Sequence, residues 1–145
     1  MFNVKQLVQE QKDQVIRLRR ELHQIPEPAY TEKKTSARVA DHLKTAGLDV
    51  QTGIAKFGVV GLLRTERPGP TLMIRADMDA LPVTEQTGLS FSSTHAGAMH
   101  ACGHDAHMAM VLGAALVLSQ MKDKLKGNIK FIFQPAEEGP EGQSP

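Results

Sequence analysis

The chain has 145 residues, of which 41% are hydrophobic and 23% charged, a composition that excludes a disordered segment and fits a folded globular domain. Its formal net charge of +1 provides no broad basic surface for nucleic acid or for an anionic membrane. We therefore expect neither nucleic acid nor a membrane among its partners.

Two helices are predicted in the first third of the chain. The first covers about residues 4–24 and is followed by two prolines, which a helix interior does not tolerate. Its apolar residues recur at helical spacing, at Val15, Leu18 and Leu22. The second covers about residues 31–46, and Gly47 stands where a left-handed residue commonly ends a helix.

Three extended runs follow, and together they predict strands. They lie at residues 49–52, 59–64 and 71–76, and a polar linker with two prolines and a glycine separates the last two. The third run is the strongest of the three, and it leads directly into Asp77 and Asp79. This part of the chain is therefore expected to supply neighbouring strands of one sheet.

The rest of the chain is predicted to form a loop, a helix and a strand. The loop covers about residues 82–97, and the helix follows with apolar residues at helical spacing and Asp105 as its N-cap. The strand covers residues 128–133 and leads into residues 134–142. Helices that alternate with strands predict an α/β fold, a sheet with helices on its faces.

The single cysteine and the lack of long apolar segments indicate the cellular compartment in which we expect the protein. One cysteine, Cys102, cannot form an internal disulfide, which fits a reducing environment. The first residues lack the basic and apolar regions of a secretory signal, and the longest mostly apolar stretch, residues 108–118, is too short to span a bilayer. We therefore expect a cytoplasmic protein.

The strongest chemical signal lies in residues 100–107, where three histidines, Cys102 and Asp105 stand within eight residues. Thiolate and imidazole occur together as ligands of zinc and neighbouring metals. Cys102 and His104 precede a predicted helix, whose positive end favours the thiolate form that binds a metal. The alternative is a small buried thiol beside surface histidines, but the carboxylates that follow nearby strands favour a metal site.

A second signal is the pair Glu137 and Glu138, which follows the last predicted strand. Neighbouring residues of an extended chain point to opposite sides, so one carboxylate can bind a metal while the other acts as a general base on water. An isolated pair of glutamates is usually a solvated loop. Its position after a strand favours a site, because ligands in open α/β sheets gather where strands end.

A third signal is the pair Asp77 and Asp79. Carboxylates two residues apart on a strand face the same way, so they can bind a cation or orient a ligating histidine. A turn with aspartate hydrogen bonds explains them equally well. His23 and Glu27 are weaker candidates for the border of a site, since residues near a helix end are more often caps or packing residues.

Four segments follow each other in the order and spacing of one known family: RRELHQIPEPAYTE (19–32), IRADMDALPV (74–83), MHACGHDAH (99–107) and FQPAEEGP (133–140). From about residue 15 onward, the chain resembles the aminoacylases, hippurate hydrolases, N-acetyldiaminopimelate deacetylases and auxin-conjugate amidohydrolases. These enzymes form one family of two-metal metallopeptidases.

The resemblance implies an enzyme that hydrolyses the amide bond of N-acyl amino acids by metal-activated water. It implies two divalent ions, Zn, Mn, Co or Ni, in a parent protein that we expect to be a homo-oligomer. It matches Cys102, His104 and Glu138 to metal ligands. It matches Glu137 to the general base, and either Asp77 or Asp79 to the supporting catalytic aspartate.

The resemblance also implies a fold, a partial αβα sandwich. Residues 1–145 match the N-terminal portion of the catalytic domain, and the lid and dimerisation domain of the family is absent from them. Family members carry further ligand histidines after the glutamate pair, and residues 139–145 depart from the family pattern. We therefore expect a truncated form that is inactive alone, with strand 128–133 left without its usual neighbours. The alternative is a non-catalytic remnant that binds a partner.

Overall fold

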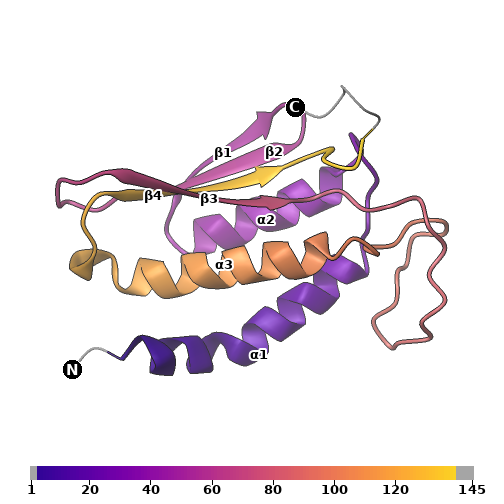
Figure 1. Ribbon diagram of the computed structural model, residues 1–145, viewed down its shortest axis with the longest axis horizontal. Helices are drawn as coiled ribbons and strands as arrows, with labels where there is room; N and C mark the ends of the chain where they lie inside the picture. The colour runs from indigo at the N-terminus through magenta and orange to yellow at the C-terminus, as the bar shows by residue number, and fades with distance from the viewer. Residues whose placement is uncertain (1–2, 140–145) are drawn as a thin grey trace.

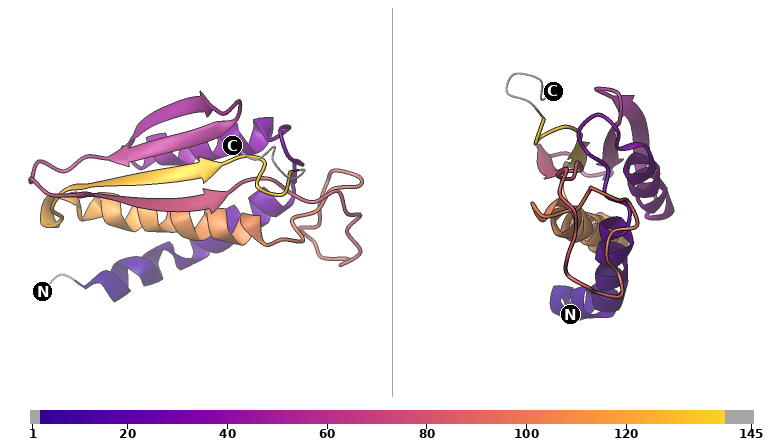
Figure 2. Two further views of the ribbon diagram at one scale, coloured as in Figure 1. Left: turned by 45° about the horizontal axis from the view of Figure 1, so that its top comes forward. Right: turned by 90° about the vertical axis from the view of Figure 1, so that its right-hand side faces the viewer.

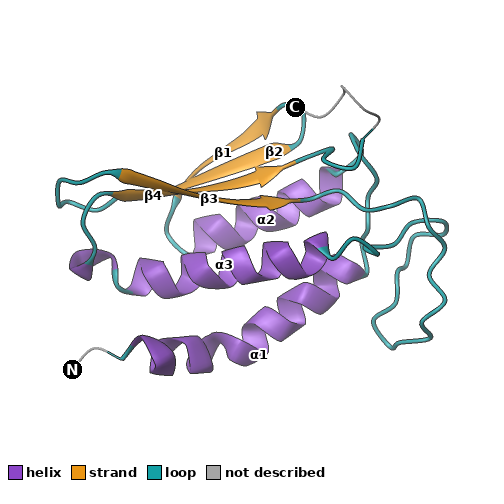
Figure 3. Ribbon diagram, viewed as in Figure 1, coloured by secondary structure: helices purple, strands orange, loops and turns teal. Residues whose placement is uncertain are grey.

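Helices and strands fill most of residues 3–139, which are the residues that the computed structural model describes (Figures 1 and 3). Residues 140–145, which hold the end of the last motif and the tail that departs from the family pattern, lie outside them. In chain order the elements are α1 (Val4–His23), α2 (Lys33–Thr45), β1 (Asp49–Ile54), β2 (Gly58–Leu63), β3 (Thr71–Asp77), α3 (His104–Gln120), a short 3-10 helix (Lys122–Lys124) and β4 (Asn128–Gln134).

The predicted helices and strands are confirmed, with ends that agree to about two residues. Gly47 also has its predicted role. It takes a left-handed φ of 81°, and its N–H donates to the carbonyl oxygen of Lys44 at 2.9 Å. The next N–H, that of Leu48, donates to the carbonyl oxygen of Leu43, so the last carbonyl groups of α2 are satisfied.

The predicted N-cap of α3 is wrong. The cap is Gly103, with a left-handed φ of 92°, and the helix begins at His104. Asp105 lies in the first turn with its carboxylate fully buried, where it binds the imidazole of His23 at 2.6 Å and the guanidinium of Arg19 at 2.9 Å. Both partners on α1 contact Oδ2, and Asp105 lies inside the helix, two residues after the cap, so it is not the N-cap.

The four strands form one sheet in the order β1-β2-β4-β3. β1 and β2 are antiparallel, as are β2 and β4, whereas β3 runs parallel to β4 with Asp77 opposite Gln134 (Figure 2). Since β3 and β4 end side by side, the residues that follow them meet at the same edge of the sheet. The expectation that strand 128–133 lacks neighbours is wrong, because β4 is paired on both sides; within residues 3–139, β1 and β3 are the edge strands.

The helices lie on one face of the sheet, in two layers. α2 packs against β1 and β2, α3 packs against β3, and α1 packs against α3 (Figure 1; right-hand view of Figure 2). The α/β class and the partial sandwich are confirmed, with one helical face present within residues 3–139. None of the helices in these residues is long and apolar enough to cross a membrane.

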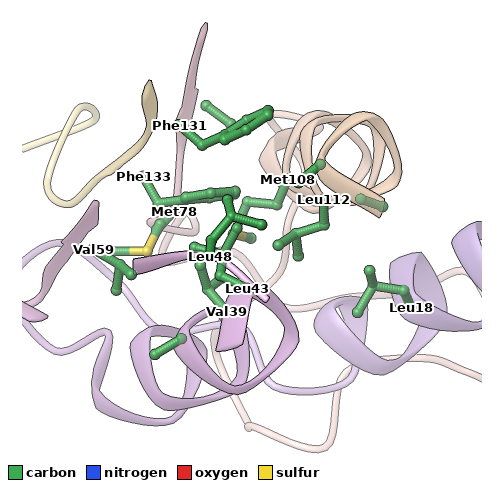
Figure 4. Packing of buried hydrophobic residues seen from close by; sticks show 14 of the residues in the cluster. Leu18, Val39, Leu43, Leu48, Val59, Met78, Met108, Leu112, Phe131 and Phe133 are labelled. Atoms are coloured by element: carbon green, nitrogen blue, oxygen red, sulfur yellow. The ribbon is translucent and has the colours of Figure 1, made fainter. Parts of the chain in front are cut away.

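The core lies between β4 and the helices beneath it. Phe131 and Phe133 are fully buried and face Met108 and Leu112 of α3 (Figure 4). Alternate residues of β4 point into this core, so a slip of one residue would expose both rings. Burial of each such side chain stabilises the fold by about 1.5–3 kcal/mol. The core therefore fixes the register of β4, and with it the position of the residues that follow the strand.

Candidate metal centre

Polar side chains gather at the edge where β3 and β4 end and α3 begins, which is the right-hand end of the molecule in Figure 1. Asp77 is the last residue of β3, and Asp79 follows after one residue. Gly103 leads into His104, and β4 leads into the glutamate pair. Three separate motifs of the sequence therefore contribute to one region of the structure.

His104 stands at the centre of this region. Its buried imidazole places Nδ1 2.9 Å from the backbone carbonyl oxygen of Asp79. A carbonyl oxygen only accepts, so Nδ1 carries a proton and Nε2 is left to face the carboxylates of Glu137 at 3.7 Å and Glu138 at 4.0 Å. The carboxylate of Asp79, whose Oδ1 lies 3.6 Å from Nδ1, and then the side chain of Cys102 raise the pKa of His104 to about 11. A cation bound here would replace the proton on Nε2, because Nδ1 keeps its proton for the carbonyl oxygen of Asp79.

Cys102, His104 and Glu138 form the first group of possible ligands. Each offers a donor atom, and the three atoms lie within 4.8 Å of one another. The thiol of Cys102 also lies 3.7 Å from the carbonyl oxygen of Asp79, the same oxygen that holds His104. A thiol, an imidazole and a carboxylate are the donor types that zinc prefers in proteins. The structure thus brings together the three residues that the family resemblance matched to metal ligands.

Asp77, His104 and Glu137 form a second group, and their donor atoms also lie within 4.8 Å of one another. This group shares only His104 with the first. Its carboxylates are the harder donors that manganese and similar ions accept together with imidazole. The imidazole of His104 therefore stands between two possible cation positions.

The two aspartates differ in burial and in partners. Asp79 is fully buried, and its Oδ2 accepts a hydrogen bond of 2.8 Å from the backbone N–H of Glu138. Burial alone would raise the pKa of Asp79, but hydrogen bonds from His104, Glu138 and Glu137 hold it below its ordinary value. The side chain of Asp77 is 19% exposed and pairs with Arg75 at 2.8 Å. Asp79 thus supports the donors, whereas Asp77 belongs to a donor group itself.

We expected the glutamate pair to lie on an extended segment of chain, but it does not. β4 ends at Gln134, and Glu137 and Glu138 belong to a turn. Ala136 takes a left-handed φ of 57°, and its carbonyl oxygen accepts from the N–H of Gly139 at 3.4 Å. The two carboxylates therefore do not point to opposite sides; both approach Nε2 of His104.

The three histidines of the 100–107 segment have different environments. Only His104 belongs to the two donor groups. His100 is buried, and its ring nitrogens have no hydrogen-bond partner among residues 3–139; this burial lowers its pKa to about 4. His107 is exposed, with its ring 6.0 Å from that of His104. Residue type alone does not distinguish these three positions.

His23 and Glu27 are structural residues. His23 is buried between Asp105 at 2.6 Å and Glu85 at 3.2 Å, where it ties α1 to α3 and to the loop after β3. The carboxylate of Glu27 accepts from the N–H groups of Lys34 and Thr35, which caps α2 from outside the helix. The sequence analysis missed a further buried glutamate, Glu32, whose Oε1 accepts from the N–H of Ala136 at 2.8 Å. These partners are distant in sequence, so no local pattern marks them.

Comparison with known proteins gives consistent matches. The family model for peptidase family M20/M25/M40 matches residues 73–145, half of the chain. The chain is 50% identical over 132 residues to thermostable carboxypeptidase 1 of Saccharolobus solfataricus, which covers 90% of this chain and 34% of that protein. It is 47% identical over 135 residues to the N-acetyldiaminopimelate deacetylase of Listeria innocua, which covers 92% of this chain and 36% of that protein.

A solved structure agrees. The YXEP protein of Bacillus subtilis, described as a dinuclear metal binding peptidase of the M20 family, superposes with a TM-score of 0.83 at 42% identity. The match covers 87% of this chain and 35% of that one. The chain spans about a third of the length of the relatives that it matches. Because the family model covers half of the chain, and the sequence and structural relatives agree with it, this chain belongs to peptidase family M20/M25/M40.

Proposed function

We propose that this chain carries part of the active site of a cation-dependent amidohydrolase that cleaves N-acyl amino acids. The observation that carries the proposal is the donor group of Cys102, His104 and Glu138, with Glu137 directly beside it. The deacetylase and carboxypeptidase names of the relatives, and the dinuclear metal site named for the similar structure, support the same class of reaction.

The donor atoms suit two divalent cations. Cys102, His104 and Glu138 would hold one. Asp77 would help to hold the second, with Glu137 beside it as the general base. The thiolate favours zinc, while manganese, cobalt and nickel also accept imidazole and carboxylate. Two four-coordinate cations take about eight donors, more than the five side chains that residues 3–139 supply here. We therefore propose that the 145 residues alone bind a cation but do not turn substrate over.

The division of labour follows from exposure and hydrogen bonding. When bound, the cations would polarise the amide carbonyl and lower the pKa of the attacking water. Glu137, with a side chain 41% exposed, accepts a proton from that water and donates it to the leaving nitrogen. Asp79 holds both His104 and the N–H of Glu138, so it keeps the donors in their arrangement.

A second candidate function is the binding of a partner protein, which the edge strand β3 favours. Leu72 and Met73 are 60% and 62% exposed on this strand. An uncovered edge strand with apolar side chains is a surface that pairs with another chain. This function predicts binding without turnover, and a lysine in place of Met73 should then abolish the binding.

The sequence also leads us to propose a cytoplasmic location for the whole protein, and a homo-oligomer. These proposals rest on its single cysteine and on the family resemblance, respectively. Neither of them bears on the arrangement of the donor atoms.

The test uses the gene product that contains this chain, stripped with a chelator and then supplied with Zn²⁺, Mn²⁺, Co²⁺ or Ni²⁺. It should hydrolyse N-acetyl amino acids only with a cation. Glu137→Gln should keep the cation and lower kcat on the order of 10²-fold or more, whereas Glu138→Gln should lose cation. The opposite pattern would reverse the two roles, and hydrolysis without any cation would refute the proposal.

A further inference from the structure

Two buried carboxylates from distant parts of the chain hold the turn that carries Glu137 and Glu138. Asp79, after β3, accepts from the N–H of Glu138 at 2.8 Å. Glu32, before α2, accepts from the N–H of Ala136 at 2.8 Å. The two hydrogen bonds lie on either side of Glu137, so they restrain the backbone at that residue from both directions.

Ala136 needs such a restraint. Its φ of 57° lies in the left-handed region, which a residue with a β-carbon rarely adopts. Ala136 is fully buried, so its N–H would lack any partner without Glu32. The hydrogen bond to Glu32 therefore satisfies a buried donor at the position where the chain turns toward the donor groups.

Glu32 does not serve its own helix through its side chain. It is the N-cap residue of α2, yet its side chain makes no capping hydrogen bond, and only its backbone oxygen accepts from the N–H of Ser36. The side chain is fully buried, and this burial raises the pKa of Glu32. An apolar side chain would fill this space with less desolvation, so packing alone does not explain a carboxyl group.

We propose that Glu32 is a positioning residue that holds the Ala136–Glu138 turn so that both glutamates face His104. This role rests on the proposed function, because the turn matters to catalysis only if Glu137 and Glu138 act there. Glu32 touches neither cation nor substrate in this assignment. It acts through the backbone of Ala136, and its removal should loosen the carboxylate side of the site while Cys102 stays in place.

The test compares three variants of the 145-residue chain. Glu32→Gln keeps an oxygen that can accept from Ala136, whereas Glu32→Met removes it. Glu27→Met is the matched control, because Glu27 is also a buried carboxylate before α2 but bonds to Lys34 and Thr35 instead of the turn. The measurements are the hydrogen-exchange rate of the Ala136 amide without metal, Co²⁺ affinity by absorbance, and thermal unfolding.

Glu32→Met should speed the exchange of the Ala136 amide and weaken Co²⁺ binding by about 10- to 100-fold, the usual size for a residue that supports a ligand. The thiolate-to-cobalt absorption band of Cys102 should persist at saturating Co²⁺. Glu32→Gln should restore slow exchange and most of the affinity. Glu27→Met should lower thermal stability but leave the exchange rate of the Ala136 amide and the Co²⁺ affinity near those of the unchanged chain.

Equal losses of affinity in Glu27→Met and Glu32→Met would overturn the proposal, as would unchanged exchange at Ala136 in Glu32→Met. If the unchanged chain bound no Co²⁺, the proposed function would fail, whereas the exchange rate of Ala136 would still decide whether Glu32 holds the turn. If Glu32→Met does not fold, Glu32→Asp replaces it. The aspartate side chain is one methylene shorter, so it should also speed the exchange of the Ala136 amide and weaken Co²⁺ binding.

Discussion

The imidazole of His104 and the backbone of Asp79 are joined by a hydrogen bond of 2.9 Å, from Nδ1 to the carbonyl oxygen. The thiol of Cys102 lies 3.7 Å from the same oxygen, and the carboxylate of Asp79 accepts from the N–H of Glu138. A single residue after β3 therefore contacts all three members of the first donor group. This arrangement fixes the tautomer of His104 and leaves Nε2 toward the carboxylates.

Asp79 should matter more than Asp77 to both stability and cation binding. Asp79→Ala leaves the N–H of Glu138 without its acceptor, which should lower the free energy of unfolding by about 1–3 kcal/mol. It should also weaken Co²⁺ binding by about 10- to 100-fold. Asp77→Ala should change stability by less than about 0.5 kcal/mol, since its partner Arg75 is exposed. Urea unfolding and Co²⁺ titration measure both effects, and a larger stability loss for Asp77→Ala would contradict this ranking.

Glu85 should make stability depend on pH in the acid range. Hydrogen bonds from the N–H of Ser93 and the hydroxyl of Thr87, and then the contact with His23, lower the pKa of Glu85 from 4.5 to about 2. A folded-state pKa below the unfolded value means that this stabilisation is present above pH 4.5 and is lost as the pH falls through about 2.

Glu85→Gln should therefore be less stable than the unchanged chain at neutral pH, and the difference should shrink as the pH falls from 4.5 to about 2. Denaturant unfolding at a series of pH values gives this difference, in which the contributions of the other carboxylates cancel. The exposed Glu66, changed to Gln, serves as the control. A difference for Glu85→Gln that stayed constant with pH would exclude the role given to its charge.

Gly103 should link backbone conformation to cation binding. Its φ is 92°, and a β-carbon there would meet no atom within 4 Å, so Gly103→Ala costs only backbone strain, about 1–2 kcal/mol. Gly88 has a φ of 68° and is equally open, so Gly88→Ala should cost a similar amount. Only Gly103→Ala should weaken Co²⁺ binding, because Gly103 lies between two donors. Equal Co²⁺ affinities in the two variants would show that the turn at Gly103 does not set the site.

Local patterns of the sequence predicted the elements and the donor residues. Helix and strand ends were close because apolar spacing, prolines and Gly47 act over a few residues. Cys102 and His104 could be identified because their donor atoms belong to one short segment. The sequence did not decide which of Asp77 and Asp79 is the supporting aspartate, because that choice depends on which carboxylate is buried.

Contacts between distant residues explain what the sequence did not predict. Asp105 resembles an N-cap, but its carboxylate is bound by His23, 82 residues away. Glu137 and Glu138 follow a strand, but the turn at Ala136 is held by Glu32, 104 residues away. The place of β4 inside the sheet depends on pairing with β2 and β3, which no periodicity within β4 can reveal.

The most direct test of the central claim is a Co²⁺ titration of the chain followed by absorbance, since a thiolate bound to Co²⁺ gives a strong near-ultraviolet band. We predict that the band appears in the unchanged chain and in His107→Ala, whose histidine is exposed and outside both donor groups. It should be absent in Cys102→Ala, and in His104→Ala it should need far more Co²⁺. Equal Co²⁺ affinity and an unchanged band in both of these variants would contradict the assignment of Cys102, His104 and Glu138 as a cation site.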